Sequence, residues 1–107
     1  GLPWERAKAF DGALVLSDFA PLPGDTQELS LELHIDGKLR QAGGVELMMY
    51  PPSTILGELE KFMRLEDGDI IMTGTPAGVG AVAPGERFHG RVLQHGQLLV
   101  EGQWQAQ

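Results

Sequence analysis

The sequence predicts a β-rich α+β domain, and three features of the chain support this. Apolar and polar residues alternate in short runs typical of half-buried strands. A single stretch, from Ser53 to about Arg64, has the apolar spacing of an amphipathic helix. Fifteen glycines and seven prolines supply turns between these short elements. With 107 residues, the chain is expected to form part or all of one domain, without internal repeats.

Two β-hairpins are expected. In the first, apolar residues alternate with polar ones from Leu29 to Ile35, Asp36-Gly37 forms a type I′ turn, and residues 38–41 return antiparallel. In the second, residues 88–93 and 98–101 flank a turn at His95-Gly96. Both hairpins would present one apolar face to a core.

The remaining expected elements are the helix and the segments before and after it. Pro51 and Pro52 end the preceding element, and Ser53 is the expected N-cap. The apolar stripe of the helix then follows: Ile55, Leu56, Leu59, Phe62 and Met63. After a turn at 67–68 we expect a strand at 69–73 and a glycine-rich loop at 74–80. Residues 1–24 are expected to be irregular, apart from a short buried strand at 13–16.

Composition narrows the class of protein. Hydrophobic residues make up 42% and charged residues 21%, the balance of an ordinary globular chain, and no apolar run is long enough to span a bilayer. Without cysteine or a secretory leader pattern, a cytoplasmic location is expected. A net charge of −7 argues against nucleic acid as a partner. An anionic substrate would need placed cations, for which Arg6, Lys8 and Arg40 are candidates.

The most informative stretch is Gly-Asp-Ile-Ile-Met-Thr-Gly-Thr-Pro-Ala-Gly-Val-Gly at residues 68–80. It resembles the fumarylacetoacetate hydrolase family, whose members carry a nearly identical strand and Gly-Thr-Pro loop. Residues 3–11 and the hairpin segment 35–41 agree with the same family in order and spacing. The resemblance covers almost the whole chain and implies the C-terminal portion of a mixed β-roll catalytic domain.

The resemblance also implies chemistry. Such enzymes act on small 2-oxo acids, as acylpyruvate hydrolases, oxaloacetate decarboxylases, or isomerases or hydratases of 2-oxo diacids, and a homodimer is expected. Thr75 and Gly74 would bind a substrate carboxylate, because glycines let backbone N–H groups converge and the hydroxyl adds a donor. Lys8 would face the substrate and stabilise negative charge. The plainer alternatives are a strand-ending turn and a surface lysine, while Asp11 and Arg6 fit a structural ion pair as well as catalysis.

The expected cofactor is Mg²⁺ or Mn²⁺, but no metal ligand is expected in this chain. In the family, a Glu-x-Glu pair and a later Asp hold the cation, and both precede the stretch that matches residues 3–11. Glu58 and Glu60 would lie on the helix, about 200° apart, and cannot bind one ion together. The three histidines lack metal-ligand spacing and are expected at the surface.

The chain also departs from the family after the first hairpin, where Gly44, Val45 and Leu47 replace polar residues common in relatives. Part of the active-site wall is therefore uncertain. Two hypotheses remain: a metal-dependent 2-oxo-acid enzyme formed with an upstream portion, or a non-catalytic half that serves folding, dimerisation or complementation of another chain.

Overall fold

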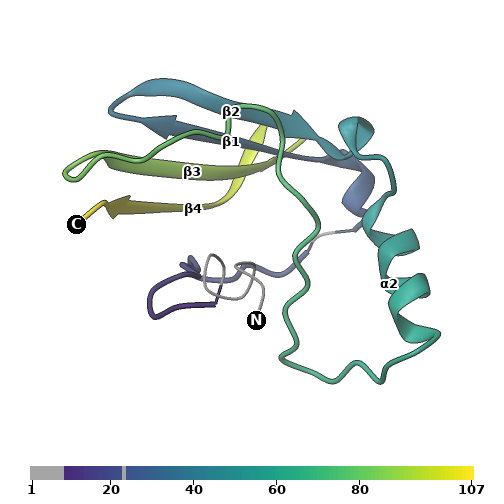
Figure 1. The fold of residues 1–107 in the computed structure, drawn as a ribbon. Helices are drawn as coiled ribbons and strands as arrows, with labels where there is room; N and C mark the ends of the chain where they lie inside the picture. Colours follow the sequence, from purple (N-terminus) through teal and green to yellow (C-terminus); the bar gives the residue numbers. More distant parts are fainter. Residues whose placement is uncertain (1–8, 23) are drawn as a thin grey trace.

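A four-stranded antiparallel sheet dominates the computed structural model, which describes residues 9–22 and 24–107 (Figure 1). Its strands are β1 (Leu29–Ile35), β2 (Lys38–Gly44), β3 (Arg87–Gln94) and β4 (Gln97–Gln105), in the spatial order β2-β1-β3-β4. One α-helix, α2 (Pro52–Glu60), and two 3-10 turns, η1 (Thr26–Glu28) and η2 (Val45–Leu47), complete the fold. The β-rich α+β class is confirmed.

Both expected hairpins form. The first has the type I′ turn expected for it, and the second has a turn of the same geometry. Asp36 and Gly37 have φ of 51° and 80°, and His95 and Gly96 have φ of 50° and 76°. Positive φ at both central residues defines the type I′ turn, whose twist matches that of the flanking strands. The hairpins join through β1 and β3, which run antiparallel from Leu29 opposite Gln94 to Ile35 opposite Phe88.

The face of the sheet that carries the β1 leucines is apolar and closely packed around Trp104. A Cβ atom built on Gly90 would lie 3.3 Å from the indole ring, and one on Gly102 would lie 2.7 Å from it. These glycines of β3 and β4 therefore leave room for the ring to lie against the strands. Trp104 itself is half-buried.

The helix differs from its expected form at both ends. Pro51 is the N-cap residue and Pro52 begins the helix, whereas Ser53 makes no capping bond, so the expected Ser53 cap is wrong. A proline suits the first helical position because its missing N–H would be unpaired there anyway. The helix ends at Glu60, and Phe62 beyond it is 72% exposed. The C-terminal part of the apolar stripe has no packing surface among the described residues.

Neither short strand expected outside the hairpins forms. Residues 13–16 and 69–73 have no ladder partner, and most of their apolar side chains are exposed, including Val15 at 57% and Met72 at 73%. A strand needs a neighbour for its backbone hydrogen bonds. Within the described ranges no neighbouring strand is available to them, so the apolar runs remain extended but unpaired.

The buried core is small. Of the hydrophobic residues that the structure describes, Val45 and Leu93 are the ones with less than a tenth of their surface exposed. No helix in residues 9–22 and 24–107 has the length and apolar character needed to cross a membrane. The sheet thus offers a stable frame whose apolar surface remains largely uncovered.

Candidate functional site

The Gly-Thr-Pro loop at residues 74–80 lies against strand β2, at one edge of the sheet (Figure 1). Two consecutive side chains of β2 hold it there. Arg40 donates from Nε to the carbonyl oxygen of Gly78, and Gln41 donates from Nε2 to that of Pro76, both at 3.0 Å. The first hairpin and the loop, two separate stretches of the family motif, are therefore brought together.

Glycine is required in this loop for two different reasons. Gly74 has φ of 110°, a conformation that side chains rarely adopt, although a Cβ there would have open space. Gly78 has φ of 106°, and a Cβ on it would also collide with the Arg40 carbonyl oxygen. A Cβ on Gly80 would collide with the Arg40 guanidinium group. The loop is thus in close contact with β2.

Thr75 lines a cavity of about 430 Å³ between the loop, the sheet and the start of α2. Loop residues 73–76 form one side of it. The opposing wall is mainly apolar and includes Leu29, Leu31, Val45, Leu47, Met48, Met49, Tyr50, Ile55 and Val92. A few polar groups on a mostly apolar wall are the usual composition of a small-molecule site.

The departures from the family noted after the first hairpin fall in this wall. Gly44 ends β2, Val45 is buried in η2, and Leu47 is 70% exposed, and all three line the cavity. The cavity wall at these positions therefore consists of backbone and aliphatic groups. These three positions therefore offer no side-chain hydrogen-bonding group to the cavity.

Lys8 and Arg6 lie outside the described residues, so their expected places near the substrate stay predictions. Asp11 is described and is exposed. Of the three cations considered, Arg40 is the one whose position is described, and it contacts the loop through the bond to Gly78. Its guanidinium group also adds positive charge beside the loop of an acidic chain.

The described residues do not provide a site for a divalent cation. No group of three or more His, Asp or Glu side chains comes together in the part of the chain that the structure describes. Glu58 and Glu60 both lie on α2, and the Glu58 carboxylate pairs instead with Lys61 Nζ at 2.9 Å. Mg²⁺ requires several oxygen ligands around one point, which this arrangement does not offer.

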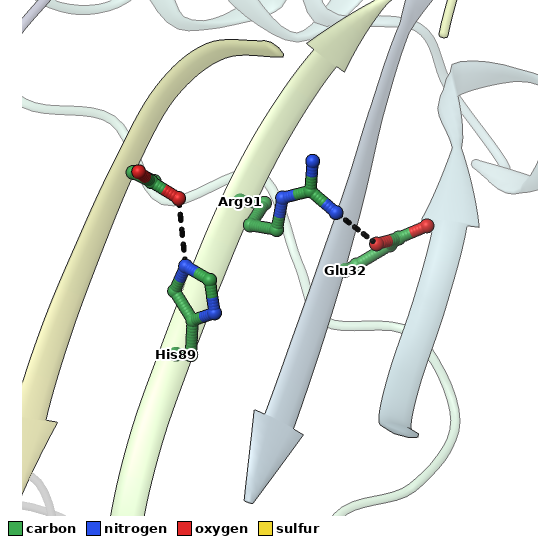
Figure 2. Close-up of polar contacts among 4 residues, drawn as sticks. Glu32, His89 and Arg91 are labelled. Atoms are coloured by element: carbon green, nitrogen blue, oxygen red, sulfur yellow. Dashed lines mark hydrogen bonds and ion pairs between the residues drawn. The ribbon is translucent and has the colours of Figure 1, made fainter. Parts of the chain in front are cut away.

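A second polar cluster lies on the face of the sheet opposite the β1 leucines (Figure 2). Glu101 lies 2.7 Å from His89 Nε2, and Glu32 lies 3.4 Å from an Arg91 nitrogen. His34 is opposite His89 in the ladder, and its Nδ1 atom is buried without a partner. Both histidines are expected at the surface from sequence, but His34 and His89 are half-buried on the central strands β1 and β3. His34, His89 and Arg91 line a separate hollow, and no residue of that hollow lines the Thr75 cavity.

The comparisons with known proteins agree with the motif. The family model for the fumarylacetoacetate hydrolase C-terminal domain matches residues 1–103. A mitochondrial oxaloacetate tautomerase of Saccharomyces cerevisiae is 39% identical over 94% of this chain and 42% of its own length. A fumarylpyruvate hydrolase of Ralstonia is 34% identical over 86% of this chain and 48% of its own length.

Solved structures share the fold. The crystal structure of a putative fumarylacetoacetate isomerase/hydrolase from Oleispira antarctica matches with a TM-score of 0.90 and 32% identity, over 98% of this chain and 49% of that one. The chain therefore spans less than half the length of these relatives.

Proposed function

Because this chain belongs to the fumarylacetoacetate hydrolase family, we propose that it forms the C-terminal part of a catalytic domain that acts on small 2-oxo acids. Relatives that act on oxaloacetate or fumarylpyruvate support this substrate class. The observation that carries the proposal is the position of Thr75, on a glycine-rich loop at the mouth of a mostly apolar cavity. A homodimer is part of the proposal.

In this proposal the loop binds a substrate carboxylate. The Thr75 hydroxyl and the backbone around Gly74 supply fixed donors, and the apolar wall excludes water around the carbon skeleton. Lys8 supplies positive charge near the 2-oxo group. Fixed donors of this kind stabilise negative charge that develops when a C–C bond breaks or a proton moves next to a carbonyl. The two relatives differ in reaction, so hydrolysis, decarboxylation and isomerisation all fit the same loop.

A metal ion is also part of the proposal, but its ligands are expected outside this chain. The described residues bring no group of three or more metal-ligating side chains together. Carboxylates from outside this chain would bind it, and it would polarise the 2-oxo group as a Lewis acid.

Substitution of Thr75 tests the site. In the full-length protein that contains this chain, Thr75→Ala is expected to lower kcat/KM for the best 2-oxo acid by about 10²–10³, the usual effect of losing one oriented donor. The melting temperature should change little, because Thr75 is exposed. Thr26→Ala, at a half-buried threonine in η1, is a matched control. Wild-type kcat/KM in the Thr75 variant would exclude the proposed role of the loop.

The second candidate function is a non-catalytic half, and the lack of a carboxylate cluster among the described residues favours it for the chain alone. Residues 1–107 by themselves are expected to bind Mn²⁺ only weakly, without a saturable micromolar site, and to turn over no 2-oxo acid. Isothermal titration with Mn²⁺ and an oxaloacetate assay measure the two properties. If the full-length protein is equally inactive, the non-catalytic function is favoured, whereas tight stoichiometric Mn²⁺ binding by residues 1–107 would reveal a ligand set outside the described part.

A further inference from the structure

The Gly-Thr-Pro loop depends on very few bonds for its position. In the part of the chain that the structure describes, residues 70–82 make no backbone hydrogen bond to the sheet. The bonds that join them to β2 come from two side chains, Arg40 to the Gly78 carbonyl and Gln41 to the Pro76 carbonyl. A loop without a backbone ladder takes its conformation from contacts of this kind.

These two bonds lie close to the proposed donor. Gln41 holds the carbonyl of Pro76, the residue next to Thr75, and the proline ring restricts the chain at that point. Pro76 also lies against β2, since a Cβ on Gly43 would be 3.3 Å from the Pro76 Cβ. Gln41 is half-buried, which limits the competition of water for its bond.

Arg40 holds the loop two residues further along the chain. Its Nε bond reaches Gly78, and its backbone and guanidinium group fill the space that Cβ atoms on Gly78 and Gly80 would need. The middle of the loop is therefore held at two points, Pro76 and Gly78, by neighbouring residues of one strand. The register of β2 shifts at this point, because Gln41 lies opposite Leu33 and Leu39 lies opposite His34. Arg40 is therefore the extra residue of a bulge, an irregularity that re-aims side chains and suits the contact of both residues with one loop.

We propose that Arg40 and Gln41 are positioning residues that hold Thr75 in its binding orientation, an inference that rests on the proposed function of the loop. Neither side chain needs to touch the substrate. Loss of either bond would let Thr75 move, and misplacement of a positioning group by about 1 Å can cost about 100-fold in rate.

A double-mutant cycle in the full-length protein tests this inference. Gln41→Leu keeps much of the side-chain volume but removes the donor. It is expected to lower kcat/KM for oxaloacetate or the best 2-oxo acid by roughly 10- to 100-fold. In the Thr75→Ala background the same change should have less than about a third of that effect, because the group it positions is gone. Arg40→Met, at an exposed side chain, should show the same non-additivity without affecting folding.

The matched control is Lys38→Met, which removes a positive charge from the same strand. Lys38 has no hydrogen bond or ion pair to the described loop residues, so kcat/KM should stay near wild type. Limited proteolysis provides a readout independent of activity: cleavage within residues 74–80 should become faster in the Gln41 and Arg40 variants but not in the Lys38 variant.

The outcomes separate the two hypotheses. Fully additive effects, or unchanged kcat/KM and proteolysis in both the Gln41 and the Arg40 variants, would overturn the positioning role while Thr75→Ala still identifies the loop as the site. If Thr75→Ala keeps wild-type kcat/KM, the proposed site itself is wrong, and the positioning role is wrong with it.

Discussion

At the scale of single residues, the close contact between the loop and β2 depends on glycines in the loop as well as on the side chains of β2. Arg40 can approach the loop because Gly78 and Gly80 have no Cβ atoms. Gly85, by contrast, has a similar φ of 87° but open space around it. Gly78 and Gly85 thus have similar φ values for different reasons. Gly78 allows the contact with β2, whereas Gly85 allows only the turn.

This difference predicts different outcomes for alanine at the two positions. Gly85→Ala should cost about 1–2 kcal/mol of unfolding free energy from the left-handed conformation and leave activity unchanged. Gly78→Ala adds a collision with the Arg40 carbonyl oxygen, so the loop must lift from β2 and kcat/KM should fall by at least about 10-fold. Urea denaturation and steady-state kinetics of the full-length protein measure both effects. Equal loss of activity in the two variants would show that the contact with β2 is irrelevant to function.

The predictable part of the site is limited by what a local motif can specify. The motif at 68–80 identified the loop and Thr75, and the hairpin motif identified Arg40 and Gln41 as neighbours in sequence. The bonds from these side chains to Pro76 and Gly78 join residues 35 and 38 positions apart, a pairing that no local pattern encodes. The charge of Arg40 suggested a role toward an anion, but its Nε is engaged by a loop carbonyl.

At the scale of elements, the hairpins followed from sequence because turn chemistry and alternation agree within each of them. The strands expected at 13–16 and 69–73 did not form, since apolar β-prone residues form a strand only beside a neighbour. The helix was expected to continue to Arg64 but stops at Glu60, because no apolar surface covers Phe62. Local sequence patterns thus predict an element whose pairing strand is a few residues away. They fail for an element whose packing partner is distant in the sequence.

The second hairpin turn offers a prediction at this scale. His95 occupies the first central position of a type I′ turn with φ of 50°, where asparagine is the favoured residue. His95→Asn should therefore raise the unfolding free energy by up to about 1 kcal/mol, because asparagine tolerates the left-handed region better than histidine. The 3.6 Å pair between His95 and Glu28 is exposed, so its loss should subtract little.

Thermal denaturation of the full-length protein measures this effect, with Asp36→Asn at the equivalent position of the first turn as the control. The Asp36 carboxylate accepts a bond from the Arg87 backbone N–H, and an amide oxygen can accept it too, so little change is expected there. A lower melting temperature in the His95 variant would indicate a contact of the imidazole that outweighs the strain of the turn.

At the scale of the whole molecule, the chain exposes more surface than its mass predicts. A folded 11.6 kDa monomer has about 5,800 Å² of accessible surface, whereas this chain has 8624 Å². Its radius of gyration of 15.2 Å likewise exceeds the roughly 13 Å of a compact domain of this length. Much of the excess is apolar, as in Phe19 at 77% and Val79 at 79%. Patches of this kind indicate surfaces that contact other protein.

The uncovered surface predicts how residues 1–107 unfold by themselves. The denaturant dependence of the unfolding free energy scales with the surface that unfolding exposes, and small domains give about 1–3 kcal/mol per molar urea. Since Val45 and Leu93 are the described hydrophobic residues classed as buried, and neither is fully so, the isolated chain should give a broad transition with a slope below about 1 kcal/mol per molar. The full-length protein should give a steep one, because the remaining half of the relatives' length is available to cover the apolar face.

Circular dichroism during urea titration measures this slope, and protein concentration provides the control. If the isolated chain unfolds steeply and its midpoint rises with concentration, copies of the chain bury the apolar face in one another, and dimerisation alone completes the core. If it unfolds steeply with a midpoint independent of concentration, the chain closes its own core, and the exposed surface described here is not the state in solution. A broad, concentration-independent transition is the expected result, since a four-stranded sheet with a small buried core and a mostly exposed helix leaves little apolar area to expose.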